Sequence, residues 1–259
     1  MSLLISIVSH KQGDLVYPLL NDLQRFCSGK PLEVVLTINV PEKIPFKKTD
    51  FGFKLEMIKN ERPKGFGANH NAAFKLRSSR NFCTLNPDLR LNQDPFSPLF
   101  HLCKDKKIGA VAPLIINKEK GIEDSARRLP TPARLLKRYL WKPKHDILDY
   151  PVGDRILFSD WVAGIFMFFS SSVFSEMNGF DERYFLYFED VDLCSRLRLA
   201  GYQIVLDPRI SVVHNARRDS HRNYQYLQWH ILSGVRFFSS RVFWKSWLLQ
   251  FKKKVNKTL

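Results

Sequence analysis

The segment LLISIVSHKQGD, residues 3–14, begins with an apolar run and continues into a polar loop. Apolar residues then recur at helical spacing over residues 15–26, and a second apolar run, LEVVLTI, covers residues 32–38. A buried strand, a helix and another buried strand in this order are typical of a parallel sheet. We therefore predict an α/β fold, in which ligands bind beyond the carboxyl ends of the strands.

The same alternation continues along the chain. We predict strands at residues 53–58, 81–86, 108–116, 161–169, 202–208 and 210–214, and helices at 69–76, 191–200 and around Leu135, Leu136 and Leu140. An apolar stripe at three- and four-residue steps, from Tyr224 to Val242, predicts a helical end to the chain. No domain boundary is evident before about residue 215, so we expect one domain, residues 1–214, and an extension, residues 215–259.

The net charge of +16 is concentrated in the extension. Residues 215–259 hold ten Lys or Arg and one acidic residue, and they also hold three of the five tryptophans. Basic and aromatic residues together favour contact with a membrane interface. A nucleic-acid surface and a core-packing helix with a solvated basic face are the competing interpretations. The longest unbroken apolar stretch has nine residues, whereas a membrane-spanning helix needs about 20.

Four scattered cysteines show no metal-ligand spacing, which is typical of reduced thiols in a cytosolic protein. The apolar N-terminus is short and lacks a basic n-region. It is therefore interpreted as a first strand and not as a signal peptide.

A cluster of carboxylates lies in the segment FLYFEDVDLCSRLRLAGY, residues 185–202. Glu189 and Asp190 precede or begin a predicted helix, where they could simply cap its backbone N–H groups. Asp192 has Arg196 four residues later as an ion-pair partner. Capping needs only one carboxylate, however, and a carboxylate at a helix start beside aromatic rings is also well placed as a general base.

The segment NERPKGFGANHNAAF, residues 60–74, combines glycines with amide side chains before a helix. Gly65 and Gly67 permit close backbone approach, and the start of the helix could meet a phosphate. The segment has neither the P-loop nor the GxGxxG pattern, so taken alone it is a weak indication of nucleotide binding.

Asp88 follows a predicted strand in the segment LNPDLRL, residues 85–91. Its carboxylate could bind a hard cation, or the Asn-Pro-Asp sequence could be an ordinary turn. His214 ends the predicted strand ISVVH, where a structural role is the more common one. Proximity of His214 to Asp88 would instead favour a metal site.

Five segments in chain order, GFGANHN, LNPD, DWVAGIFMF, NGFDERYFLYFEDVDLCSRLRLAGY and VVH, together resemble a known family. They are similar to the inverting family-two glycosyltransferases of GT-A fold, and most similar to the bacterial rhamnosyltransferases of O-antigen and cell-wall linker assembly. The resemblance covers about residues 3–240 and is most specific from Gly179 to Gly201. It implies a Rossmann-like, mostly parallel sheet flanked by helices, followed by a C-terminal helical, basic and aromatic extension.

The resemblance also implies roles for individual residues. Asp190, with Glu189 beside it, would be the general base that activates the acceptor hydroxyl. Asp88 would stand at the last position of the metal motif, and His214 would complete a Mg²⁺ or Mn²⁺ site. The nucleotide-sugar donor would contact Ser9, His10, Asn39, Gly65, Phe66, Gly67, Asn69, Asn71, Asn86 and Asp88. On the acceptor side the matching residues are Asp160 and Trp161.

Two departures from the family pattern concern donor binding. Ile38 stands where many relatives have an Asp that binds the nucleotide base. The metal motif, here Asn-Pro-Asp, has one acid instead of two, which suggests metal binding that is weaker or assisted by the donor.

The implied activity is that of a hexosyltransferase in O-antigen (lipopolysaccharide) synthesis. L-Rhamnose would move from dTDP-L-rhamnose to a polyprenyl-diphosphate-linked sugar such as N-acetylglucosamine. The enzyme would be cytoplasmic and peripheral on the inner face of the cell membrane, with no nucleic-acid partner. The alternatives are the same class of enzyme using a UDP-hexose or UDP-galactofuranose, and a catalytically silent protein that binds nucleotide sugars or glycans.

Overall fold

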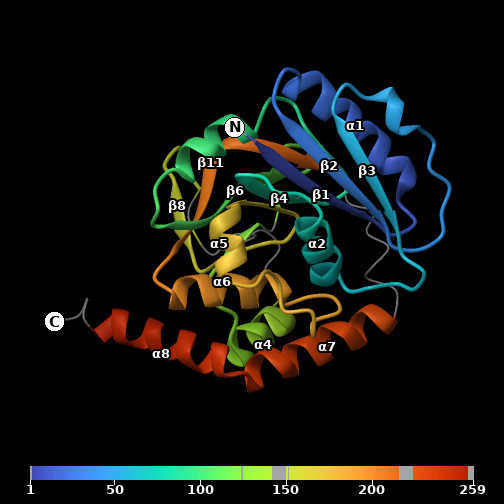
Figure 1. The fold of residues 1–259 in the computed structure, drawn as a ribbon. Helices are drawn as coiled ribbons and strands as arrows, with labels where there is room; N and C mark the ends of the chain where they lie inside the picture. The colour runs from blue at the N-terminus through green and yellow to red at the C-terminus, as the bar shows by residue number, and fades with distance from the viewer. Residues whose placement is uncertain (1, 124, 142–149, 151, 216–223, 256–259) are drawn as a thin grey trace.

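A computed structural model describes residues 2–123, 125–141, 150, 152–215 and 224–255. Within these residues a nine-stranded sheet forms the centre of the molecule, and helices cover both of its faces (Figure 1). The strand order is β3-β2-β1-β4-β10-β6-β11-β5, and β8 pairs with β11 off this path.

The first half of the sheet is parallel. It consists of β1 (Leu3–Ser9), β2 (Leu32–Ile38), β3 (Lys54–Lys59) and β4 (Asn81–Leu85). Successive side chains of a strand point to opposite faces, so Ile5 and Leu4 join two different core clusters. The cluster around Ile5 includes apolar residues of α1 (Gly13–Cys27), whereas the cluster around Leu4 includes Ala73 of α2 (Phe66–Lys75). The two helices therefore cover opposite faces.

The second half of the sheet is mixed. β10 (Phe166–Ser170) lies antiparallel between β4 and β6 (Ile108–Ile116). β11 (Gln203–His214) runs parallel to β6 and antiparallel to β5 (Leu89–Arg90) and to β8 (Leu157–Ser159). A separate small sheet pairs β7 (Ala126–Arg127) with β9 (Trp161–Val162).

Helices α7 (Tyr224–Ser239) and α8 (Arg241–Val255) follow one another in a band beside α6 (Glu189–Leu199) (Figure 1). A third core cluster, formed by Leu129, Tyr184, Phe188, Val191, Phe237 and Phe243, joins them to the rest of the protein. The remaining helices are η1 (Lys48–Asp50), α3 (Phe96–Leu102), α4 (Pro132–Trp141) and α5 (Ser171–Glu176). Residues 216–223 and 256–259 of the predicted extension lie outside the described part, and the boundary at residue 214 stays a prediction.

The predicted α/β class is confirmed, but three predicted elements were wrong in extent. The run 161–169 contains two strands of different sheets, because Ala163 N–H turns away to Ser125 O and Ile165 O accepts from Asn86 N–H. Residues 203–214 form one strand, in which an irregularity between Asp207 and Ser211 accommodates Pro208. The terminal stripe covers two helices, since the Ser240 hydroxyl accepts from Phe243 N–H and starts α8.

Candidate active site

The carboxyl ends of β1, β2 and β4 meet at one edge of the sheet, as parallel strands must. Ser9 ends β1, and its carbonyl oxygen accepts from Asn39 N–H at 2.9 Å, just beyond β2. Asn86 follows β4, and its N–H donates to Ile165 O at 2.9 Å. Three of the predicted donor-binding residues therefore lie along one edge.

The side-chain amide of Asn39 binds the loop after β3, which contains Asn60 and Lys64. Its Nδ2 donates to Lys64 O at 3.0 Å and lies 3.2 Å from His10 Nδ1. Its Oδ1 accepts from Asn60 Nδ2 at 2.9 Å and from Lys64 N–H at 2.8 Å. Asn39 thus fixes the loop that holds Asn60 and Lys64, and its contact with a donor stays a prediction. Ile38 is buried at the end of β2.

The amides of α2 also have partners within the protein. Asn69 donates to Lys64 O at 3.1 Å and to Gly65 O at 3.0 Å. Asn71 donates to Phe180 O at 2.8 Å and accepts from Phe180 N–H at 2.9 Å. Asn71 therefore ties α2 to the segment that leads to α6, and the donor contacts predicted for both side chains remain predictions.

Gly65 and Gly67 allow this segment to pack directly on α2. A Cβ at Gly65 would lie 2.8 Å from Phe185 O, and a Cβ at Gly67 would lie 2.6 Å from Phe180 Cβ. The N–H of Phe66 donates to Phe185 O at 2.8 Å. Gly65 is needed for the close approach of two backbones, and Gly67 for the close approach of the Phe180 side chain, whatever they contact in a donor.

His70 is a buried residue that the sequence did not single out. Its Nδ1 lies 2.8 Å from Ser6 Oγ, and its ring contacts the ring of Phe66 at 4.3 Å between centroids. Burial lowers the pKa of His70 to about 3, so the imidazole is neutral at physiological pH. It packs against the Phe66 ring and carries no charge into the site.

The predicted catalytic carboxylates form the first turn of α6. Tyr187 and Phe188, immediately before it, both have left-handed backbone angles, with φ of 70° and 66°. Such angles are unfavourable for bulky residues and are concentrated at functional sites. Here they redirect the chain so that Glu189 and Asp190 start the helix.

Asp190 and Glu189 have different surroundings. Asp190 accepts from Val191 N–H at 2.8 Å and from Gly164 N–H at 2.9 Å, and Gly164 also lies against the Phe66 ring. Glu189 is buried, and its Oε2 has no hydrogen-bond partner among the described residues. Burial, and then the charge of Asp190, raise the pKa of Glu189 well above its usual range. Glu189 therefore favours the neutral form. Both carboxylates lie beside residues 65–71, the segment predicted to bind the donor and called the donor segment below: Asp190 reaches it through Gly164, and a Cβ at Gly67 would lie 3.8 Å from Glu189 Cβ.

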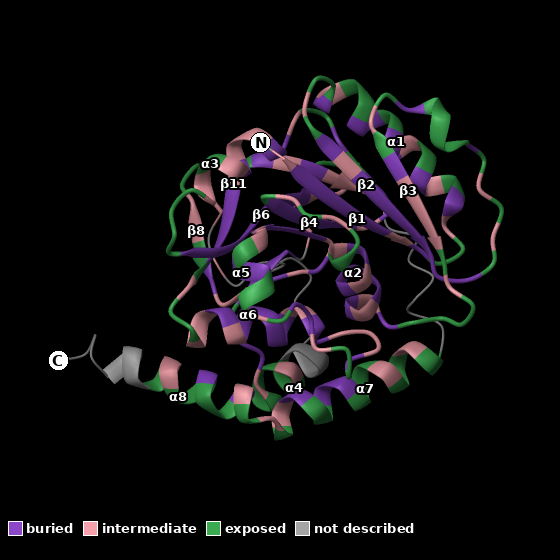
Figure 2. Ribbon diagram, in the orientation of Figure 1, coloured by how far each residue is buried: buried purple, intermediate pink, exposed green. Residues whose placement is uncertain are grey.

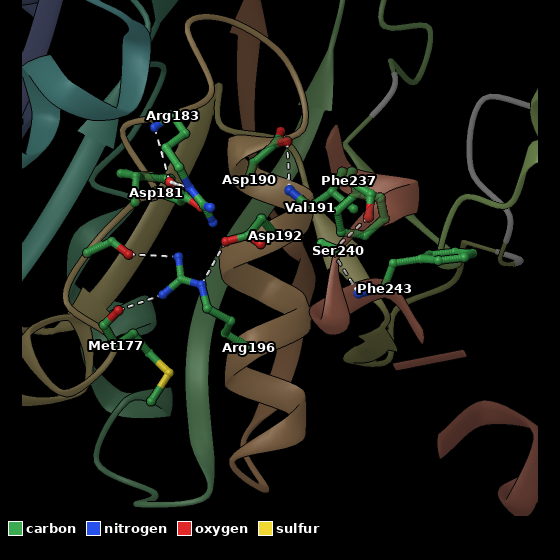
Figure 3. A network of polar contacts seen from close by, with 12 residues as sticks. Met177, Asp181, Arg183, Asp190, Val191, Asp192, Arg196, Phe237, Ser240 and Phe243 are labelled. Carbon is green, nitrogen blue, oxygen red and sulfur yellow. Dashed lines mark hydrogen bonds and ion pairs between the residues drawn. The ribbon is translucent and has the colours of Figure 1, made fainter. Parts of the chain in front are cut away.

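Asp192 is a structural residue, and its predicted pairing with Arg196 is confirmed. Arg196 Nε lies 2.7 Å from Asp192 Oδ2, and its other nitrogens donate to Met177 O at 2.5 Å and Gly179 O at 2.8 Å (Figure 3). The pair therefore attaches α6 to the turn that follows α5.

Asp88 and His214 are brought together by the pairing of β5 with β11. His214 Nε2 lies 3.2 Å from Asp88 Oδ2, and His214 Nδ1 lies 2.5 Å from Glu123 Oε2. Burial lowers the pKa of His214, but the hydrogen bonds and charges of Asp88 and Glu123 outweigh it and raise the pKa overall. Glu123 was not predicted, because nothing in the surrounding sequence marks it.

The chemistry of this pair fits a divalent cation. Asp88 is buried, and its Oδ1 has no hydrogen-bond partner among the described residues. Carboxylate oxygen and imidazole nitrogen are ligands that Mn²⁺ accepts, and Mg²⁺ prefers the oxygen. The described residues contain no group of three or more His, Cys, Asp or Glu side chains arranged to hold a metal ion. Asp88 and His214 would therefore supply only part of a coordination shell.

Asp160 connects three parts of the protein. It pairs with Arg198 of α6 at 2.8 Å and accepts from Leu129 N–H at 2.8 Å and from the Gln250 side chain of α8. Trp161 donates from its indole nitrogen to Arg128 O at 3.0 Å. The role of both residues in acceptor binding stays a prediction. Within the described residues, no helix is both long and apolar enough to cross a membrane.

Comparisons with known proteins show which proteins the chain is similar to. No family model matches the chain. The rhamnosyltransferase WbbL of Escherichia coli K12 is 26% identical over 253 residues, which cover 92% of each chain. The N-acetylglucosaminyl-diphospho-decaprenol L-rhamnosyltransferase of Mycobacterium tuberculosis is 29% identical over 153 residues, 53% of this chain and 48% of that enzyme.

A similar fold occurs in solved structures. The crystal structure of GalNAc-T7 with UDP, GalNAc and Mn²⁺ superposes with a TM-score of 0.63 at 16% identity. The match covers 83% of this chain and 44% of that one, so the likeness concerns the fold. The sheet and the similarity to named rhamnosyltransferases lead to one conclusion: the chain is a glycosyltransferase with a GT-A fold that is similar to the rhamnosyltransferases.

Proposed function

We propose that this enzyme transfers L-rhamnose from dTDP-L-rhamnose to a polyprenyl-diphosphate-linked sugar with inversion at the anomeric carbon. The observation that carries the proposal is the position of Asp190 at the first turn of α6. One of its carboxylate oxygens accepts from Gly164 N–H, and Gly164 lies against Phe66 of the donor segment. A carboxylate in this position can take a proton from an acceptor hydroxyl as that oxygen attacks the sugar.

In this proposal the two neighbouring carboxylates have different protonation states and different roles. Asp190, which accepts two backbone hydrogen bonds, is the ionised base. Glu189, buried with an unpartnered oxygen, is kept neutral and does not repel the negative charge of Asp190. Asp88 and His214 would hold a Mg²⁺ or Mn²⁺ ion, which when bound would neutralise the charge that develops on the nucleotide diphosphate.

The choice of donor and acceptor rests on the relatives. The similarity to WbbL extends over almost the whole of both chains, and its name specifies rhamnose transfer. The mycobacterial enzyme is named for an acceptor in which a sugar is linked through diphosphate to decaprenol. A lipid acceptor of this kind places the reaction at a membrane surface, and here we propose the inner face of the cell membrane.

The outer face of α7 and α8 supports contact with that surface. The first part of the predicted apolar stripe points away from the protein, since Leu227, Ile231 and Val235 are all more than half exposed. Its last part, Phe238 and Val242, packs against the third core cluster. The side of α7 that faces the protein instead carries the small residues Ser233 and Gly234 and the buried Phe237 (Figure 2). Residues 224–255 contain no acidic residue, so the face combines apolar and basic groups, as an interfacial helix does.

The decisive experiment measures nucleotide diphosphate release from dTDP-rhamnose, UDP-glucose, UDP-galactose, UDP-N-acetylglucosamine and GDP-mannose. Each donor is combined with a synthetic lipid-diphosphate-N-acetylglucosamine, in Mg²⁺ and in EDTA. We expect turnover of dTDP-rhamnose in Mg²⁺ only. Turnover of another donor would keep the enzyme class and replace the sugar.

One alternative is favoured by particular residues. Ile38 in place of an acid and the single carboxylate of the Asn-Pro-Asp motif would suit a silent nucleotide-sugar-binding protein. Such a protein would bind a donor in calorimetry and release no nucleotide with any acceptor of the panel.

A further inference from the structure

We propose that Glu123 is a positioning residue for the cation site and fixes the ring of His214 so that Nε2 is the metal-binding nitrogen. This inference rests on the proposed binding of a cation by Asp88 and His214. Imidazole can bind a metal through either nitrogen, and a hydrogen bond at one nitrogen decides which of them remains available. Glu123 makes that hydrogen bond: its Oε2 lies 2.5 Å from His214 Nδ1.

The backbone fixes the positions of all three side chains. β6 continues into a turn in which Gly121 N–H donates to Asn117 Oδ1 at 2.7 Å. The returning chain then forms an isolated antiparallel bridge between Ile116 and Ile122, and Glu123 N–H donates to Ile115 O at 2.8 Å. The turn therefore places Glu123 beside the end of β11, where His214 lies.

Asp88 is held from the other side. Leu89 is paired with His214 in the β5–β11 register, and Asn215 N–H donates to Asp88 O at 2.8 Å. The Asp88 carboxylate therefore faces Nε2, while Glu123 faces Nδ1. The side chains of His214, Asp88 and Glu123 are only 13%, 10% and 22% exposed, so water competes weakly for these hydrogen bonds.

The same geometry argues against Glu123 as a metal ligand. The two imidazole nitrogens lie on different edges of the ring and point in different directions. A cation bound at Nε2 beside Asp88 is therefore out of reach of a carboxylate hydrogen-bonded to Nδ1. This agrees with the absence of any three-residue metal-binding group among the described side chains. Glu123 would act on the cation only through His214.

The test is a titration of the full chain with Mn²⁺ alone. The electron paramagnetic resonance signal of the free ion measures how much Mn²⁺ remains unbound, and so gives the affinity. Glu123→Ala should weaken Mn²⁺ binding about 10- to 100-fold, the usual effect of losing such an outer partner. Glu123→Gln, which can still accept from Nδ1–H, should weaken it less. Glu119→Gln, in the same turn and exposed, is the matched control and should bind as the unchanged protein does.

Calorimetry with dTDP in EDTA provides the structural control. Glu123→Ala should leave this metal-free binding unchanged, because the edge formed by Ser9 and Asn39 is untouched. Unaltered Mn²⁺ affinity in Glu123→Ala would overturn the positioning role while leaving the proposed function in place. A loss as large as that of His214→Ala would make Glu123 a ligand and would also overturn it. No Mn²⁺ binding by the unchanged protein would overturn both this role and the proposed cation.

Discussion

At the scale of single residues, Asp190 is the group on which transfer should depend most. Asp190→Asn keeps the side-chain shape and an acceptor for Gly164 N–H but removes the base. We expect a loss of about 100- to 10,000-fold in the rate of sugar transfer, the usual contribution of a general base. Binding of dTDP, measured by calorimetry, should change little. Asp181→Asn, which alters the exposed pair with Arg183 (Figure 3), is the control and should retain activity. Full turnover in Asp190→Asn would exclude this base.

Glu189 should make stability depend on pH. Its pKa is raised, chiefly by burial, from an ordinary value of 4.5. Above that pH the unfolded chain loses the Glu189 proton while the folded chain keeps it, so this group lowers the free energy of unfolding as the pH rises towards the folded-state pKa. Gln cannot ionise, so Glu189→Gln should gain stability relative to the unchanged protein between about pH 5 and about pH 8.

Urea unfolding of both proteins at the two pH values measures this difference. Glu119→Gln, at an exposed position, should show no such pH-dependent gain. A difference between Glu189→Gln and the unchanged protein that stays constant with pH would mean that Glu189 is ionised in the folded state.

The residues that could be predicted from sequence are those with a local pattern. The position of Glu189 and Asp190 at a helix start and the Asp192–Arg196 pairing could be predicted because neighbours in sequence reveal them. The catalytic and metal-binding roles of Glu189, Asp190 and Asp88 stay predictions. Glu123 could not be found, because its partner His214 is 91 residues away in the chain. The hydrogen bonds of Asn39 and Asn71 were hidden for the same reason, since each is satisfied by a distant loop.

At the scale of elements, α6 should depend on Arg196 for its attachment. Arg196→Met leaves the Asp192 carboxylate, only 3% exposed, without its cation and leaves Met177 O and Gly179 O without their donor. We expect the free energy of unfolding to fall by about 2–4 kcal/mol, since a buried charge without a partner is costly. Urea unfolding checks this value. Arg183→Met removes a pair whose cation is 70% exposed and should cost less than about 1 kcal/mol. Equal losses of unfolding free energy in the two variants would show that Asp192 can be buried without Arg196 at little cost.

Elements with one clear period were predicted almost to the residue, and those that change direction were not. The strands at residues 32–38 and 108–116 have the predicted bounds because each is an unbroken buried run. The run 161–169 is equally apolar, yet it bends at Ala163–Ile165 to bring Gly164 N–H to Asp190. An apolar run predicts only that its residues are buried, so the bend at Ala163–Ile165 could not be predicted from it.

At the scale of the whole molecule, the active-site edge and the helical band are physically connected. Phe185, which accepts from Phe66 N–H in the donor segment, also contacts Trp229 of α7 at 4.6 Å between ring centroids. The Ser233 hydroxyl donates to Leu186 O at 2.8 Å. A surface bound by α7 and α8 would therefore lie next to the chain that carries Asp190. This adjacency suits an acceptor whose sugar reacts while its lipid stays in the membrane.

Membrane binding should depend on the exposed apolar side chains of α7 and α8. Truncation near residue 240 would also remove Phe243 from the third core cluster, so point substitutions are the sharper test. Leu232→Ser with Val235→Ser removes two side chains that are 66% and 63% exposed. At about 1 kcal/mol for each partly inserted side chain, co-sedimentation with anionic vesicles should weaken roughly tenfold or more. Phe158→Ser, on β8 and 59% exposed, is the matched control.

Salt and lipid composition separate membrane binding from self-association. Binding of the unchanged protein should fall with added salt and on vesicles without anionic lipid, because Arg236, Arg241 and Lys245 are exposed on the same helices. The double variant should fold normally, since neither side chain belongs to the core. If its vesicle binding were unchanged while a dimer of the unchanged protein dissociated on gel filtration, the apolar face would be the interface between two copies of the chain, and the membrane role would fall.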